Sequence, residues 1–408
     1  MSIALDGALV HPAVARARLE AETAWSCPPA LVEATASIAV VRRLVADQLS
    51  AKAIDVDLNS EYPEEFLRAL GRAGGFQGAA ATEFGGNGLS LQHVVRVMEE
   101  VAKVCLSTGF LVWCQTACAR YVQMSDNEAL KRRLLARIVG GDILAGTGLS
   151  NTIKSCDTIE EFRLSARRVD GGYVVSGALP WVSNLGPTHY FATGCPVVGQ
   201  PATEDGLVFV LVDCQSPNFR LVESARFVAL DGTRTVACQF KETFVPDAMV
   251  LAHPGQSRAY FQRIKPGMIL AQMGMGLGLI DACVEMMRQS NKTHAHVNQY
   301  LDDQVDDVDA VLQQTRAATY ALCEALDHQS GAVPIVDILK VRLAGGEHSL
   351  LAANAAMLHV GAKGYQKRSA AQRRLREAYF IAIVTPATKH LRREIARLAA
   401  GNGHGIGV

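Results

Sequence analysis

The spacing of apolar residues changes twice along the 408-residue chain and divides it into three parts. From about residue 31 to residue 141, apolar residues recur at three- and four-residue steps, as in LSLQHVVRVMEEVAKV at residues 89–104. That spacing places them on one face of an amphipathic helix. The stretch KRRLLARIV at residues 131–139 continues the pattern. We therefore expect an N-terminal α-helical domain over residues 1–140.

Between residues 141 and 255 the apolar period shortens towards two, which is typical of strands. FRLSARRV alternates, Asp170, Gly171 and Gly172 supply a hairpin turn, and YVVSGALPWVS is the predicted return strand. Further strands are predicted in HYFATG, GLVFVLVDC and TVACQFKETFV. The pattern predicts a middle β-domain over residues 141–255.

From Ser257 to Ala400 the helical period returns, with turn signals at residues 291–300, 329–334 and 361–370. Long helices with short connections indicate a helical bundle, expected here over residues 256–408. Helices, then strands, then helices again indicate an α+β fold. The tail GNGHGIGV, residues 401–408, is expected to fray.

The charge balance gives no reason to expect nucleic acid or a membrane as a partner. Forty basic residues match forty acidic ones, and no apolar run approaches the ~20 residues of a membrane helix. The N-terminus has no basic stretch followed by a long apolar block, so no secretory signal is expected. Ten cysteines, from Cys27 to Cys323, stand without a Cys-x-x-Cys pair, which fits a reducing cytosol. We expect a cytoplasmic protein with a small-molecule substrate.

Searches for common catalytic motifs fail. Gly-x-Ser-x-Gly, the Walker phosphate loop and His-Glu-x-x-His are all absent. Gly274, Gly276 and Gly278 lie in a helical pattern without a preceding strand, so close helix packing is predicted there rather than a dinucleotide loop. His294 and His296 are placed on a solvated loop, and the acidic run at residues 302–309 in the first turn of a helix. No metal site is predicted, and a nicotinamide enzyme is disfavoured.

Five short segments carry the remaining signal, in order along the chain. They are FLRALGRAGGFQGAAATEFGGNGLSLQHVVRVMEEVAK, Gly148-Leu149-Ser150-Asn151, Cys156-Asp157, LPWVSN with Trp181, Ser183 and Asn184, and HVGAKGYQKRSAAQRRLREAYF with Tyr365 and Arg376. Together they resemble the acyl-CoA dehydrogenase superfamily of flavoproteins. The resemblance implies a helical N-terminal domain, a β-barrel-like middle domain, and a C-terminal four-helix bundle.

The resemblance also implies which residues contact the flavin: Leu149, Ser150, Trp181, Ser183 and Asn184. A flavin ring needs hydroxyl or backbone donors along one edge and a flat apolar surface against one face. Ser150 would supply the first hydroxyl, Trp181 the flat surface, and Ser183 a donor near N5. Taken singly, Trp181 fits a core tryptophan equally well, and the two serines fit turn caps.

The chain departs from the superfamily at the catalytic base. The usual glutamate lies nine residues after the matched arginine, and that count from Arg376 reaches Thr385. A threonine hydroxyl does not ionise near neutral pH and cannot act as this base. The alternative glutamate position falls near Met268, and Ile269 or a neighbour replaces an arginine that holds coenzyme A. Met268, Val384 and Thr385 are therefore predicted to line the substrate pocket, without an identified base.

Two further differences concern the nucleotide half of the cofactor. THAHVNQY stands where the superfamily has an Arg-x-x-Phe-Gly turn, and Leu358 replaces a glutamine three residues before Gly361. This predicts weaker binding of FAD, or use of FMN, with reduced flavin taken from a separate reductase. The monooxygenase branch of the superfamily works in that way and dispenses with the glutamate. Its frequent proline is matched by Pro386, whereas its frequent histidine is replaced by Val384.

Three hypotheses follow. The first is a reduced-flavin-dependent monooxygenase acting on a small organic substrate. The second is an acyl-CoA or acyl-carrier-protein dehydrogenase with a base at another position; Glu377 is the nearest carboxylate, but it is expected in a buried ion pair. The third is a non-catalytic flavin-binding relative. The resemblance also implies a homotetramer or homodimer, for which the apolar face of residues 334–360 is long enough.

Overall fold

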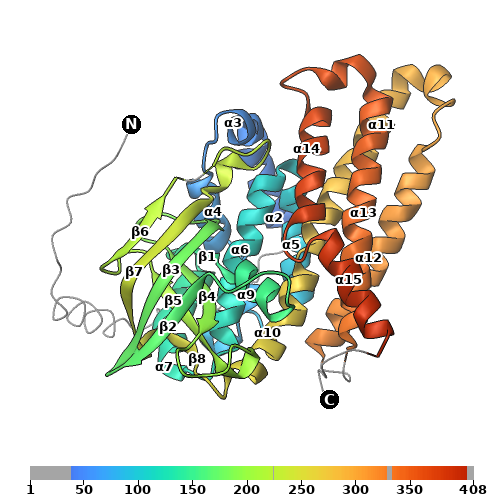
Figure 1. Cartoon of the computed structure of the whole chain (residues 1–408). Coiled ribbons are helices and arrows are strands. Elements are labelled where there is room, and N and C mark those ends of the chain that lie inside the picture. The colour runs from blue at the N-terminus through green and yellow to red at the C-terminus, as the bar shows by residue number, and fades with distance from the viewer. Residues whose placement is uncertain (1–37, 224, 329–332, 402–408) are drawn as a thin grey trace.

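The computed structural model describes residues 38–223, 225–328 and 333–401. The predictions for the N-terminal leader, for Cys27 and for the tail after Gly401 lie outside these residues. N-terminal helices, a middle β-domain and a C-terminal helical bundle follow one another along the chain and pack side by side (Figure 1).

Two long helices, α5 (Leu91–Val104) and α6 (Leu106–Gln123), form the centre of the N-terminal domain. The prediction of an amphipathic helix is confirmed for α5, and its start is fixed by Ser90, whose side chain accepts a hydrogen bond from His93 N. Helix α6 is buried on nearly every side. Shorter elements surround the pair: α2 (Ile38–Leu44), η2 (Val45–Leu49), η3 (Ser50–Lys52), α3 (Ala53–Leu58), α4 (Glu64–Arg72), η4 (Gln77–Ala79), η5 (Thr82–Phe84), α7 (Glu128–Leu130), η6 (Lys131–Leu135) and α8 (Ala136–Val139).

The middle domain contains two four-stranded sheets rather than a closed barrel. One has the order β1-β4-β5-β8 and the other β2-β3-β7-β6. The phenylalanines of the two sheets pack together, with 5.7 Å between the ring centroids of Phe191 and Phe219, so each sheet buries one face against the other. The strands are β1 (Ala145–Thr147), β2 (Leu164–Val169), β3 (Gly172–Val182), β4 (Tyr190–Pro196), β5 (Leu207–Asp213), β6 (Phe219–Val222), β7 (Val236–Pro246) and β8 (Val250–Ala252).

The predicted hairpin at Asp170-Gly171-Gly172 is confirmed, with β2 and β3 paired from Val169↔Gly172 outwards. Gly171 has a φ of 73°, a conformation that glycine adopts without a steric penalty. The three other predicted strands correspond to β4, β5 and β7.

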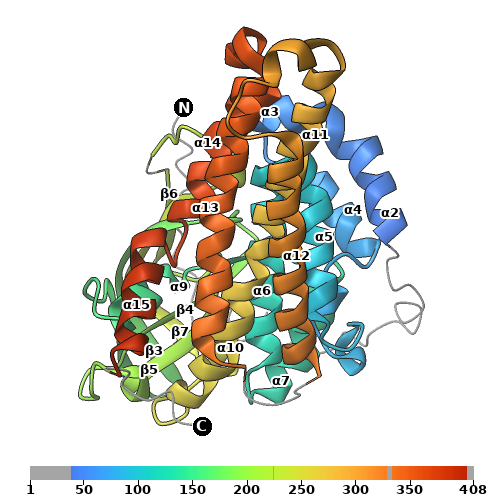
Figure 2. The same ribbon diagram turned by 90° about the vertical axis from the view of Figure 1, so that its right-hand side faces the viewer.

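The C-terminal part forms the expected bundle, in which α11, α12, α13 and α14 run side by side (Figure 2). Its elements are α10 (Ser257–Ala271), α11 (Met273–Asn298), α12 (Val305–Asp327), α13 (Ile335–Val360), η10 (Gly361–Tyr365), α14 (Ala370–Ile383) and α15 (Thr388–Ala399). An 18-residue window within Ser257–Asn298 has a mean hydropathy of 1.5, enough by composition for a membrane span, but 94% of it is buried inside the protein. It is therefore a core segment.

The turn predicted at residues 291–300 starts later than expected, because α11 continues to Asn298 and the chain turns only from Gln299. His294 and His296 consequently lie on the exposed side of a helix and not on a loop. Neither proline nor glycine interrupts this stretch, so polarity alone was a poor indicator of a turn. The acidic run does belong to the start of α12, where Gln304 and Asp307 form a reciprocal capping box.

Close packing of α5 against α11 explains two of the three spaced glycines, Gly274 and Gly278, as predicted. A Cβ atom at Gly278 would stand 2.4 Å from the carbonyl oxygen of Glu99, and one at Gly274 would stand 2.7 Å from that of Val95. Gly276 faces α13 instead, where a Cβ would make an ordinary contact of 3.4 Å.

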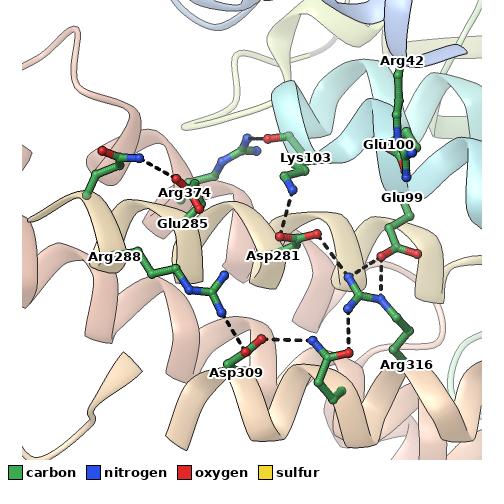
Figure 3. A network of polar contacts seen from close by, with 12 residues as sticks. Arg42, Glu99, Glu100, Lys103, Asp281, Glu285, Arg288, Asp309, Arg316 and Arg374 are labelled. Atoms are coloured by element: carbon green, nitrogen blue, oxygen red, sulfur yellow. Dashed lines mark hydrogen bonds and ion pairs between the residues drawn. The ribbon is translucent and has the colours of Figure 1, made fainter. Parts of the chain in front are cut away.

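A network of charged side chains joins α5, α11 and α12 (Figure 3). Glu99 is buried and accepts hydrogen bonds from Arg316 at 2.8 and 2.6 Å and from the Tyr320 hydroxyl at 2.7 Å. Arg316 also contacts Asp281, which pairs with Lys103 at 2.9 Å. Because each charge in this partly buried network has an opposite partner, the network holds the helices in register.

Candidate active site

A serine predicted to contact the flavin lies against the residue predicted to replace the superfamily's glutamate. Ser150 is in the first turn of α9 (Leu149–Cys156), directly after β1. Thr385 lies in the turn between α14 and α15 and precedes a cis peptide bond to Pro386. The hydroxyl oxygens of Ser150 and Thr385 are 2.7 Å apart. The structure thus brings two predicted site residues together from positions 235 residues apart.

Buried polar side chains hold the Thr385 turn in place. Gln272, at the start of α11, donates from Nε2 to the Thr385 carbonyl at 2.9 Å. Its Oε1 accepts from Nε of Arg342 at 2.7 Å, and Arg342 Nη2 donates to the carbonyl of Ile381 near the end of α14. Burial lowers the pKa of Arg342 to about 10. The cation suits this place because the C-terminus of a helix carries partial negative charge.

Met268 and Val384 add no titratable group to the site. Met268 is buried on α10, and its carbonyl accepts a hydrogen bond from Trp113 Nε1 at 3.1 Å. Val384 ends α14 and packs against the apolar core. Their role in lining a substrate pocket stays a prediction, because the cavity described below is lined by Ile269 and Pro386 and not by Met268, Val384 or Thr385.

The expectation for Glu377 is confirmed: it is a buried ion-pair partner. It is 1% exposed, its Oε2 accepts from Arg374 Nη1 at 2.8 Å, and its Oε1 accepts from the backbone N–H of Leu106 at 3.3 Å. A carboxylate engaged in this way stabilises the fold and has no access to a substrate.

Trp181, on β3, is not a core tryptophan, because 58% of its surface is exposed. Phe227 contacts it edge-on, with 6.4 Å between the ring centroids. Ser183, two residues on, is buried, and its hydroxyl lies 2.6 Å from that of Thr235. An uncovered indole close to a hydroxyl pair is the arrangement that a planar heterocycle requires, so these residues fit a flavin ring.

Leu149 and Asn184 are more deeply buried than the other predicted flavin contacts. Asn184 is fully buried with a φ of 63°; its Oδ1 accepts from the Tyr62 hydroxyl at 2.6 Å and its Nδ2 donates to the Ala145 carbonyl at 2.7 Å. Both side-chain atoms of Asn184 therefore fix the loop after β3. Leu149 is 1% exposed. Contact of these two residues with a flavin stays a prediction.

A small cavity lies next to the Thr385 turn and was not predicted. It has a volume of about 30 Å³, and Pro386 and Ile269 line it, the residues that follow Thr385 and Met268 in the chain. Its polar lining includes Asp157 and His390, whose side chains are 2.8 Å apart. Of this pair, the sequence indicated only Asp157, which belongs to the Cys156-Asp157 segment that resembles the superfamily. No motif indicated His390, which lies on α15 and is only 4% exposed.

A larger groove, of about 390 Å³, lies at the C-terminal end of α11. This is the region in which the sequence was predicted to lack the superfamily's contacts to the nucleotide half of the cofactor. Lys363, His294, Ser290 and Thr293 line it, together with Ser369 at the start of α14. Cationic and hydroxyl donors beside a helix N-terminus suit a phosphate group. Glu285 also lines the groove, and the loss of the superfamily's arginine and glutamine in this region stays a prediction.

Comparison with known proteins identifies the domains on either side of the β-domain. The family model described as "Acyl-CoA dehydrogenase, N-terminal domain" matches residues 33–142. The model described as "Acyl-CoA dehydrogenase, C-terminal domain" matches residues 260–399. The two matches fall on the N-terminal helices and on the C-terminal bundle.

Individual relatives are similar along most of the chain. The mitochondrial isovaleryl-CoA dehydrogenase of Oryza sativa subsp. japonica is 23% identical over 367 residues, which cover 87% of this chain and 88% of that protein. The short-chain specific acyl-CoA dehydrogenase of Clostridium acetobutylicum is 20% identical and covers 83% of this chain and 90% of its own length.

Solved structures share the fold. A glutaryl-coenzyme A dehydrogenase in complex with glutaryl-CoA superimposes with a TM-score of 0.81 at 20% identity, over 92% of this chain and 96% of the other. PigA with FAD and proline superimposes with a TM-score of 0.79 at 16% identity, over 93% and 100%.

Proposed function

Because this chain belongs to the acyl-CoA dehydrogenase superfamily of flavin-dependent oxidoreductases, we propose that it is a monooxygenase of a small organic substrate. One observation carries the proposal. The hydroxyl of Thr385, which is predicted to stand at the position of the catalytic glutamate, lies 2.7 Å from that of Ser150. A hydroxyl pair at this position holds the turn but does not remove a proton from carbon at neutral pH.

The site suits a reaction that depends on the placement of the substrate more than on acid–base side chains. A bound flavin would supply the electrons that activate oxygen. The protein has to orient the substrate and exclude water, and the rigid turn held by Gln272 and Arg342 beside an apolar cavity serves both needs. Ser150, Ser183 and Trp181 would hold the ring.

We propose FAD as the cofactor. The support comes from the similar structure that contains FAD and from the groove near Lys363, whose donors suit a phosphate. The FMN alternative finds no support in these comparisons. A separate flavin reductase as the source of reduced cofactor remains part of the proposal, as does a cytosolic location, which the nine free cysteines among the described residues favour.

An acyl-thioester dehydrogenase with a base at another position is the second candidate. The Asp157–His390 pair near Pro386 favours it, because a histidine supported by a carboxylate is a base that needs no glutamate. The relatives named above also carry out chemistry on acyl-CoA, according to their names.

Anaerobic titration of the oxidised, flavin-loaded protein with acyl thioesters distinguishes the two candidates. We expect isovaleryl-CoA and butyryl-CoA to leave the flavin absorption unchanged, while a superfamily member with its glutamate in place is bleached under the same conditions. Bleaching of this protein would establish the dehydrogenase and contradict the monooxygenase. A protein that binds flavin but reacts neither with acyl thioesters nor, once reduced, through an oxygen intermediate would be the non-catalytic flavin-binding relative.

A further inference from the structure

A histidine–aspartate pair lies beside the turn that carries Thr385. Nε2 of His390, on α15, is 2.8 Å from Oδ2 of Asp157, the residue that ends α9. Both side chains are buried, and both line the cavity that Pro386 and Ile269 also line. The pair therefore faces the cavity beside Pro386, the residue that follows Thr385.

Asp157 is held as an anion. Lys265 Nζ lies 3.1 and 3.3 Å from its two carboxylate oxygens, and Arg393 Nη1 donates to its backbone carbonyl at 2.5 Å. Burial alone would raise the pKa of Asp157, but the hydrogen bond from His390 and the charge of Lys265 outweigh burial and lower it. Because a carboxylate only accepts hydrogen bonds, Nε2 of His390 carries a proton.

The other ring nitrogen of His390 is left without a partner. In the neutral ring Nδ1 has a lone pair and accepts hydrogen bonds. Nδ1 is buried, and no residue within 38–223, 225–328 or 333–401 bonds to it. A buried acceptor without a partner destabilises a protein, and a natural site of this kind is usually completed by a ligand or a water molecule.

The surroundings of Nδ1 restrict what completes it. Most of the cavity wall is apolar, and the remaining ions are already paired, since Glu394 accepts from Arg393 and from Arg397. The charged groups around His390 are Asp157 on α9, Lys265 on α10, and Arg393, Glu394 and Arg397 on α15. A volume of about 30 Å³ takes one small polar group.

We propose that Asp157 and His390 form a proton-accepting subsite for the substrate. An apolar ligand inserts a hydroxyl or N–H group into the cavity, and Nδ1 of His390 accepts its hydrogen bond and then its proton. The O–H or N–H bond breaks, its electron pair stays on the ligand, and the proton forms the new Nδ1–H bond. Asp157 stabilises the resulting imidazolium.

This inference rests on the proposed function, because that proposal places the active site at the Thr385 turn. It adds to the proposed function the chemical class of the substrate. The substrate is an apolar molecule with an ionisable hydroxyl or N–H group, and the rest of the molecule lies towards Pro386. His390 is the catalytic residue of the subsite, and Asp157 is a positioning residue.

The probe 4-nitrophenol tests the subsite, because its phenolate absorbs visible light and its phenol does not. The oxidised, flavin-loaded protein is titrated with it about one pH unit below the solution pKa of the probe. We expect the phenolate-to-phenol ratio of the bound probe to exceed that of the free probe roughly tenfold, which corresponds to about one pKa unit. Absence of binding, or an unchanged ratio, would overturn the proposal.

Variants assign the effect to the pair. His390→Gln is expected to abolish the rise in phenolate, and Asp157→Asn to reduce it while the probe still binds. His296→Gln, on the exposed side of α11, is the matched control and should behave as the unaltered protein does. A His390→Gln protein that ionises the probe as well as the unaltered protein would contradict the assignment.

A measurement on the unaltered protein covers the case in which a variant does not fold. Nitrogen-15 NMR of the histidine rings should show one ring protonated at Nε2 and unprotonated at Nδ1, with the Nδ1 signal moving towards the protonated position when 4-nitrophenol is added. A proton on Nδ1 of the neutral ring, or an unchanged signal, would overturn the proposal. Neither experiment uses oxygen or turnover, so a failure of the monooxygenase proposal leaves both readouts intact.

Discussion

At the scale of single residues, the site combines side chains that short motifs identify with side chains that they do not. Ser150 and Trp181 belong to matched segments, so their placement could be predicted. Gln272, Arg342 and His390 could not, because each acts through a partner from 70 to 233 residues away in the chain. A buried glutamine or arginine in a helical pattern has no sequence feature that reveals such a partner.

Replacement of Trp181 by alanine tests the predicted flavin surface. We expect the dissociation constant for flavin to rise roughly tenfold to a hundredfold, because stacking of a heterocycle on an aromatic ring is worth about 1–3 kcal/mol. Stability in the absence of flavin should hardly change, since 58% of Trp181 is exposed. Fluorescence titration measures the affinity, and Tyr300→Ala, which also removes an exposed ring, is the control. Equal affinities of the two variants would remove Trp181 from the site.

At the scale of elements, periodicity predicted the helices and strands well but placed one boundary badly. The amphipathic pattern of α5 and the hairpin of β2 and β3 are local, and both are confirmed. The end of α11 was misplaced because its polar last turns, which lie on the exposed side of the bundle, resemble a loop in composition. The pairing of strands into two sheets rather than a barrel depends on contacts between distant segments, which periodicity does not contain.

The glycines of α11 provide a matched pair of substitutions. Gly278→Ala should lower the free energy of unfolding by about 1–3 kcal/mol, because its Cβ would collide with the backbone of α5. Gly276→Ala should be neutral or stabilising by up to about 1 kcal/mol, since its Cβ has room and alanine favours helix. Urea unfolding measures both. Equal effects would show that α5 and α11 do not approach as closely as described.

Two adjacent glutamates on α5, Glu99 and Glu100, allow the stability contribution of a buried ion pair to be compared with that of an exposed one (Figure 3). Glu99→Gln should cost about 2–4 kcal/mol of stability, because it leaves the guanidinium of Arg316 with less compensation in a buried network. Glu100→Gln should cost less than about 1 kcal/mol, because its partner Arg42 is exposed. Thermal unfolding of the two variants gives the comparison. A larger loss for Glu100→Gln would contradict the role given to the network.

At the scale of the whole molecule, the bundle leaves large apolar side chains uncovered. Tyr379 and Ile383 stand four residues apart on α14, on one face of the helix, and are 62% and 65% exposed. Tyr365, which ends η10 near the opposite end of α14 from Ile383, is also exposed but does not belong to this pair. Uncovered apolar groups that lie together favour association with another copy of the chain, as the proposed homotetramer or homodimer requires.

The double substitution Tyr379→Glu with Ile383→Glu should shift the molar mass in solution from the oligomer towards the single chain. Charges on the proposed interface oppose association without disturbing the core, because both side chains are already exposed. Light scattering after size-exclusion chromatography measures the mass. Val198→Glu, at an exposed position in the β-domain, is the control. An unchanged mass of the double variant would place the interface elsewhere.

The central claim is that this member of the superfamily activates oxygen and lacks the carboxylate used for acyl dehydrogenation. The most direct test is to reduce the flavin-loaded protein without air, mix it rapidly with oxygen, and follow the absorption spectrum. We predict a spectral species distinct from reduced and oxidised flavin, which forms first and decays before the oxidised spectrum returns. A direct return to oxidised flavin in one phase would contradict the account.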